Sequence, residues 1–187
     1  KNRKLFFKIF ISSIPVMLVG FILVETNLIN KIRNLQVISW TTIIFGVLLY
    51  ISDKCSLEKK IDKSFTYKSA IFIGLFQVLS LIPGVSRSGI AITAARILKF
   101  KRYDAAKVSF LLSIPILGAV SLFGLKNLFT EENLNFTYYN LISIFLSFIF
   151  SFITIKYFLI FIKKFSLNIF VIYRILLGII LLFIANL

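Results

Sequence analysis

The sequence predicts an all-α integral membrane protein that forms a single domain. Of its 187 residues, 59% are hydrophobic and only 16% are charged, whereas about a quarter of the residues of a soluble domain are charged. The apolar residues come in long runs, and about 20 such residues in a helix cross a hydrocarbon core of roughly 30 Å. Most basic residues lie between the runs, as in loops that face an anionic cytoplasmic leaflet. We therefore attribute the net charge of +15 to membrane topology and expect no nucleic-acid partner.

Five runs are long enough to become transmembrane helices. They cover residues 5–24, 35–51, 108–125, 138–162 and 169–187. Pro15 is a predicted kink in the first run, and neighbouring helices can tolerate it. The Phe-rich fourth run is expected to face lipid or to pack against other helices. The most hydrophilic segment, 52–68, comes directly after the second run.

Two shorter apolar pieces, 69–82 and 88–98, flank Pro83-Gly84. As a helix the first would measure about 21 Å, too little to cross a bilayer. The positive-inside rule favours a segment that returns to its own side, because the basic residues at 99–107 then join the other inner loops. Residues 69–98 are thus predicted to form a re-entrant hairpin, whose irregular backbone must be buried in protein or line a wet cavity.

The break of this hairpin contains an arginine with no acid near it in sequence. In "SLIPGVSRSGIAI", residues 80–92, Arg87 lies far from the nearest acids, Asp62 and Asp104. An arginine at membrane depth costs several kcal/mol by insertion scales, about 2.5–3.5. An anion from outside the chain would offset that cost.

The residues around Arg87 have the chemistry of a phosphate-binding site. Gly84 allows unusual backbone torsions, and Ser86 or Ser88 can cap the following helix, whose free N–H groups then point into the break. Gly89 lets an anion approach the backbone, and Arg87 adds a guanidinium fork. The alternative is a simple helix cap, with Arg87 paired to a distant acid or extended to the surface.

Other polar residues are weaker candidates for the site. Gln77 and Thr93 are candidate ligands, although Gln77 could instead bond a neighbouring helix and Thr93 its own backbone. Arg96 is expected to extend to the inner interface. The chain has no histidine and one cysteine, Cys55, which excludes imidazole catalysis and a multi-cysteine metal site within these residues.

Residues 74–89, "GLFQVLSLIPGVSRSG", closely resemble the second signature of the undecaprenyl-diphosphatase family of the bacitracin-resistance type. The stretch "RYDAAKVSFLLSIPILGA" resembles the next helix of that family. The resemblance implies a bacterial inner-membrane hydrolase with an inverted-repeat architecture and a site open to the periplasm. Its substrate would be the lipid undecaprenyl diphosphate, converted to undecaprenyl phosphate and inorganic phosphate, which recycles the carrier of peptidoglycan synthesis and confers bacitracin resistance.

The resemblance also implies roles for individual residues. Arg87 would be the principal diphosphate ligand, and Ser86, Ser88 and Gly89 complete the motif. Arg87, Ser86 and Ser88 would be the catalytic residues, and a divalent cation (Mg²⁺ or Ca²⁺) would take part. The family commonly has threonine four residues after the motif arginine, where this chain has Ala91.

The first signature of the family, which supplies glutamates and a histidine, is missing. We therefore expect residues 1–187 to be the C-terminal part of a longer protein, with the metal ligands in the remainder and little activity in this part alone. The alternative function is a protein that binds or transports a polyprenyl phosphate without hydrolysis.

Overall fold

The computed structural model describes residues 2–26, 32–54, 59–130 and 138–187. These residues are helical nearly throughout, and five of their helices are long and apolar enough to span a membrane. The predicted all-α, multi-pass membrane fold is confirmed. The elements are α1 (Asn2–Glu25), α3 (Leu35–Asp53), α4 (Ile61–Ser64), α5 (Tyr67–Val78), the 3₁₀ turn η1 (Leu79–Leu81), α6 (Arg87–Ile97), α7 (Arg102–Thr130), α8 (Tyr138–Lys164) and α9 (Asn168–Ala185).

The segment around the break is a hairpin of two short helices that returns to the end where it began. Helices α5 and α6 have 12 and 11 residues, or about 18 and 16 Å, so neither spans a bilayer. The backbone before α5 pairs with the backbone after α6: Lys59 N donates to Lys99 O over 2.6 Å, and Lys101 N donates to Lys59 O over 3.0 Å. The two ends of the hairpin are therefore adjacent, as the re-entrant prediction requires.

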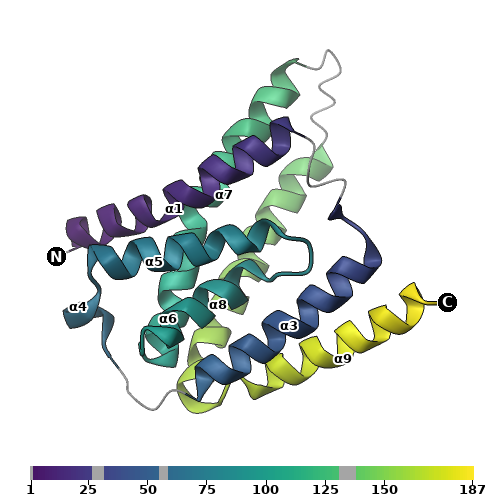
Figure 1. Cartoon of the computed structure of the whole chain (residues 1–187). Helices are drawn as coiled ribbons and strands as arrows, with labels where there is room; N and C mark the ends of the chain where they lie inside the picture. Colours follow the sequence, from purple (N-terminus) through teal and green to yellow (C-terminus); the bar gives the residue numbers. More distant parts are fainter. Residues whose placement is uncertain (1, 27–31, 55–58, 131–137) are drawn as a thin grey trace.

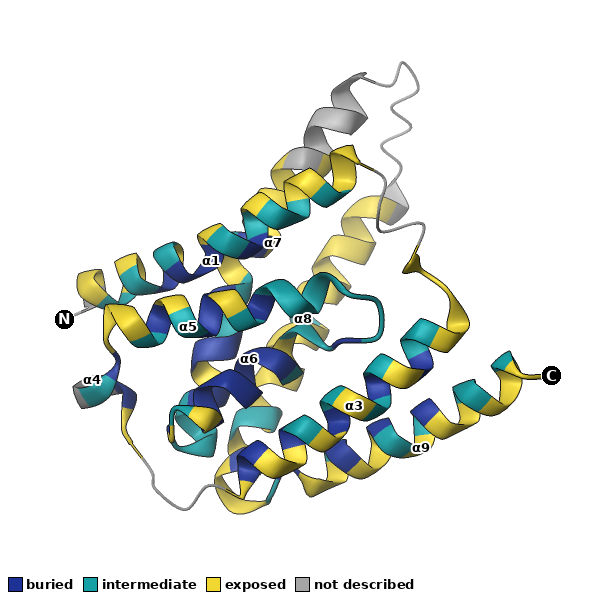
Figure 2. Cartoon of the chain, in the orientation of Figure 1, coloured by how far each residue is buried: buried dark blue, intermediate teal, exposed yellow. Residues whose placement is uncertain are grey.

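Helix α6 lies at the centre of the bundle. It packs against α3, α5 and α7, and every residue from Ile90 to Arg96 is buried (Figures 1 and 2). Ala91, Ala94 and Ala95 are fully buried, since small side chains let neighbouring backbones approach closely. Helix α8 is mostly exposed between 140 and 157 (Figure 2), which agrees with the predicted lipid-facing role of this Phe-rich run.

Small residues also set the two closest helix pairs. On α5, a Cβ added at Gly74 would overlap the Ser12 carbonyl of α1, and Ser12 Oγ donates to Ala70 O over 2.5 Å. Helices α3 and α9 lie side by side (Figure 1). There, a Cβ at Gly46 would lie 3.3 Å from the Cβ of Arg174. The α9 backbone at Arg174 is thus held against α3.

One buried carboxylate connects α3 to α6, to the start of α7 and to the start of α9, at the end of the bundle where basic residues gather. Asp53, the last residue of α3, is 5% exposed. Its Oδ1 lies 2.8 Å from Arg102 Nε and 3.3 Å from Arg96 Nε, and its Oδ2 accepts from Leu167 N over 3.4 Å. Arg96 also donates to the carbonyls of Phe100 and Asp53 over 2.7 and 2.9 Å.

The expectation that Arg96 extends to the interface is therefore wrong. Its side chain is 2% exposed, because a carboxylate and two carbonyls from nearby segments surround the guanidinium. The sequence separation between Asp53 and Arg96 concealed this partnership.

We predict that Asp53→Asn destabilises the bundle, because it leaves two arginines without their buried counter-charge. Removing one partner of a buried ion pair costs about 3 kcal/mol, which corresponds to a melting temperature roughly 6–12 °C lower in a chain of this size. The measurement is thermal unfolding in detergent. Glu25→Gln, the same chemical change at an exposed carboxylate, is the control, and equal melting temperatures for the two variants would contradict the prediction.

Candidate functional site

The backbone turns sharply between the two helices of the hairpin at Gly84. This residue has φ of +89°, the left-handed region that glycine tolerates without strain. A Cβ here would also lie 2.5 Å from Ile38 O of α3. The next helix then begins at Arg87 with Ser86 as its N-cap, whose Oγ accepts from Gly89 N over 3.1 Å. Of the two serines predicted as possible caps, Ser86 is the one used.

Helices α3 and α9 satisfy the carbonyl groups of the break. Thr41 Oγ1 lies 2.6 Å from Pro83 O, and Thr42 Oγ1 lies 3.3 Å from Gly84 O. Arg174 Nη2 of α9 donates to the same Gly84 O over 2.9 Å. Non-helical backbone at membrane depth is tolerated when protein groups surround it in this way.

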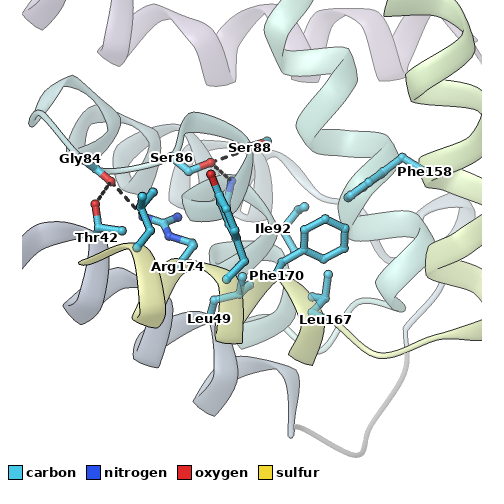
Figure 3. A pocket seen from close by; sticks show the side chains of 13 residues that line it. Thr42, Leu49, Gly84, Ser86, Ser88, Ile92, Phe158, Leu167, Phe170 and Arg174 are labelled. Atoms are coloured by element: carbon cyan, nitrogen blue, oxygen red, sulfur yellow. Dashed lines mark hydrogen bonds between the residues drawn. The ribbon is translucent and has the colours of Figure 1, made fainter. Parts of the chain in front are cut away.

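A cavity of about 350 Å³ opens beside the break. One end is polar and is lined by Thr42, Gly84, Ser86, Ser88, Gly89, Tyr173 and Arg174. Apolar side chains line the rest of the cavity: Leu49, Ile92, Phe158, Leu167 and Phe170 on one side of the polar groups, and Leu177 one helical turn beyond Arg174 on α9. In Figure 3, Arg174 and Gly84 lie on one side and the ring of Phe158 on the other. The cavity is therefore amphiphilic along its length.

The N-terminal end of α6 faces this polar end with groups that suit an anion. The first N–H groups of a helix have no acceptor within it, and no backbone hydrogen bond takes up those of Arg87 and Ser88 in the described part of the chain. The hydroxyls of Ser86 and Ser88 lie 3.3 Å apart. Together with the positive end of the helix dipole, these donors favour a phosphate.

Like the polar Thr42 and Tyr173, the charged Arg174 is a cavity residue that sequence reasoning missed. Its side chain is buried at 9% exposure. A Cβ on Gly89 would lie 2.9 Å from its Nη1, so the guanidinium reaches the start of α6. Its Nε has no hydrogen-bond partner in the described residues. The signal was available: an arginine inside the apolar run 169–187 is as expensive as one in the hairpin.

Arg87 itself is half-buried and does not line this cavity. It makes no hydrogen bond or ion pair with any described residue. Within the described part of the chain, Arg87 therefore has no carboxylate partner. Its role as a ligand for an external anion remains a prediction.

The weaker candidates lie in the core and do not line the cavity. Thr93 is buried, and its Oγ1 donates to Gly89 O over 2.9 Å. Thr93 thus bonds the backbone of its own helix, which is the alternative to a role as ligand. Gln77 is fully buried, and neither of its amide atoms finds a partner among the described residues. Ala91 is fully buried, so a threonine there would need extra room in a tight core.

The described residues do not make a cation site by themselves. They contain no group of three or more His, Cys, Asp or Glu side chains that could hold a metal ion, and no carboxylate lines the cavity. Mg²⁺ and Ca²⁺ need oxygen ligands that usually include carboxylates.

The fold and site define a multi-pass membrane protein with a re-entrant hairpin whose break presents hydrogen-bond donors to a cavity. Residues 1–180 match the family described as "Bacitracin resistance protein BacA". The chain belongs to this family, and the resemblance found in residues 74–89 is confirmed.

Curated relatives carry the name undecaprenyl-diphosphatase. One from Pelagibacter ubique is 50% identical over 96% of this chain and 70% of its own length. Those from Jannaschia sp. and Saccharophagus degradans are 37% and 44% identical, over 98% and 95% of this chain and 69% and 66% of their own lengths. The chain thus spans about two thirds of the length of these relatives.

We predict that Gly84→Ala disrupts the break, because a side chain meets both an unfavourable φ and the α3 backbone. Left-handed strain at a non-glycine residue costs about 1–2 kcal/mol before any steric overlap is counted. The expected result is a lower melting temperature in detergent. Gly118→Ala places a methyl group in open space on α7 and should be neutral or slightly stabilising. A tolerated Gly84→Ala would argue against the turn described here.

Proposed function

We propose that the protein hydrolyses undecaprenyl diphosphate to undecaprenyl phosphate and inorganic phosphate, and so recycles the lipid carrier of cell-wall synthesis. The family and the names of the relatives support this activity. The alternative, transport without hydrolysis, has no support among the comparisons.

The observation that carries the proposal is the amphiphilic cavity. A polyprenyl diphosphate is a head group with several negative charges on a long hydrocarbon chain. The cavity has hydrogen-bond donors that suit a phosphate among its polar residues, and apolar side chains line the rest. A soluble phosphate ester would not need that apolar lining.

The described residues bind and orient the diphosphate. Donors from the α6 N-terminus, the two serine hydroxyls and a guanidinium can neutralise the charge on the phosphoryl oxygens. As the phosphoanhydride bond breaks, negative charge shifts toward undecaprenyl phosphate, the leaving group. Hydrogen-bond donors held in fixed positions around these oxygens stabilise the transition state. No carboxylate or imidazole lines the described cavity, so we assign these residues no role as general base and leave the attacking group open between water and a serine.

We further propose that a divalent cation, Mg²⁺ or Ca²⁺, takes part in the reaction. Its support is the family resemblance alone, and no step is assigned to it because the described residues do not form its site. Bound to a diphosphate, such a cation would offset negative charge.

The same proposal places the protein in the bacterial inner membrane with the site accessible from the periplasm. Basic residues gather at the end of the bundle that holds Asp53, Lys59 and Lys99–Arg102, and positively charged ends favour the cytoplasm. The break lies away from that end, at the far tip of the hairpin (Figure 1).

We predict that Arg87→Lys lowers phosphate release from undecaprenyl diphosphate at least tenfold, because lysine keeps the charge but loses the planar fork. The assay uses the full-length protein in detergent with expression matched to the parent. Arg33→Lys, at an exposed position before α3, is the control. Release near the parent level from Arg87→Lys would remove this side chain from the site.

We predict that Arg174→Lys raises the KM for the diphosphate about tenfold, equal to about 1.4 kcal/mol of binding free energy. A lysine can donate to Gly84 O or to a phosphate, whereas the guanidinium can do both. Thermal unfolding of the same variant separates the two roles. A lower melting temperature with an unchanged KM would make Arg174 a support of the break only.

A further inference from the structure

The apolar part of the cavity continues directly from its polar end. On α3 the lining runs from Thr42 to Leu49. On α9 it runs from Leu177 through Arg174 to Leu167, and the stretch from Arg174 to Leu167 lies on the side of Leu49. Each pair is seven positions apart, or about 10 Å along a helix. Two neighbouring helices thus give the same distance from the phosphate donors to the far apolar end.

The direction of this extension is defined by the Asp53 cluster. Leu49 lies one turn before Asp53 on α3, and the backbone N–H of Leu167 donates to the Asp53 carboxylate. The apolar end therefore lies toward the basic end of the bundle and away from the tip of the hairpin.

Aromatic side chains from different helices form one wall of the apolar part. The rings of Phe158 on α8 and Phe170 on α9 have centroids 5.2 Å apart. Phe110 of α7 contacts Phe158 edge-on at 5.5 Å, and Phe161 contacts Phe170 edge-on at 5.9 Å. This packing supports the two cavity-facing rings from behind (Figure 3 shows both at the cavity).

We propose that this apolar part binds the first isoprene units of the lipid chain, next to the diphosphate. The proposal rests on the function proposed above and adds the course of the chain: from the α6 N-terminus, past Ile92 and along the wall formed by Phe158 and Phe170, toward Leu49. Unsaturated, methyl-branched units match a lining of aromatic and branched side chains, because both are apolar and contact-rich. A groove of about 400 Å³ between α1 and α7 is also apolar, but none of the motif residues that bind phosphate lines it.

The first test measures chain-length dependence in the full-length protein. Leu49→Phe fills the far end of the cavity, about 10 Å from the phosphate donors. Val47→Phe makes a similar enlargement at an exposed position of the same helix. For farnesyl diphosphate we expect Leu49→Phe to raise KM at least fivefold. For dimethylallyl diphosphate, which has one isoprene unit, KM should change less than twofold, and Val47→Phe should leave both values unchanged. An equal rise for both substrates with Leu49→Phe would overturn the proposal.

The second test does not depend on turnover. A farnesyl diphosphate with a diazirine on its second isoprene unit is photo-crosslinked to the protein, and the labelled peptides are mapped by mass spectrometry. Labels on the segments containing Phe158 and Phe170, suppressed by Leu49→Phe, support the proposed course. Labels on α1 and α7 instead would overturn it.

A photoreactive phospholipid serves as the control that tests whether bulk membrane lipid occupies the cavity. If it labels the cavity equally and farnesyl diphosphate does not displace it, the cavity holds bulk lipid and the proposal fails. If the parent protein releases no phosphate from undecaprenyl diphosphate, the proposed hydrolysis fails, and the crosslinking pattern still decides whether the prenyl chain lies in the cavity.

Discussion

The arrangement of the domain depends on one buried carboxylate at its basic end. Asp53 meets two arginines and a backbone N–H, which belong to α6, the start of α7 and the turn into α9. A buried charge is tolerated only with its partners in place, so these segments must assemble together. Because Arg96 lies near the C-terminal end of α6, this contact also fixes the depth of the helix. Its N-terminal end, with Ser86 and the first N–H groups of the helix, follows about 16 Å away.

The antiparallel pair α3 and α9 supports the hairpin at both ends. At the base it provides Asp53 and Leu167. At the break it provides the threonine hydroxyls and Arg174. The cavity lies between these two attachment points and is lined by the same pair. The same two helices therefore support the hairpin and line the cavity, which is why Arg174 both holds the break and lines the cavity.

The sequence predicts the elements well and the contacts between distant elements poorly. Apolar runs and the Pro-Gly break locate the spans and the hairpin, because length and hydropathy are local properties. A serine N-cap, left open between Ser86 and Ser88, and Thr93 as a back-bonded residue also follow from local chemistry. The contact of Arg174 with Gly84 and the Asp53–Arg96 pair do not, because they join residues far apart in the chain through tertiary packing. The cavity itself is formed by several helices, and no single segment carries its signature.

The closed course of the hairpin determines which faces of the membrane the two chain ends occupy. A segment that enters and leaves on one side contributes nothing to the count of crossings, which is then odd for the five spanning helices of the described residues. The amino end beside α1 and the carboxyl end after α9 therefore lie on opposite faces, at opposite sides of the bundle in Figure 1. Counting the hairpin as a sixth span would put both ends on one face and invert the assigned side of every loop after residue 98.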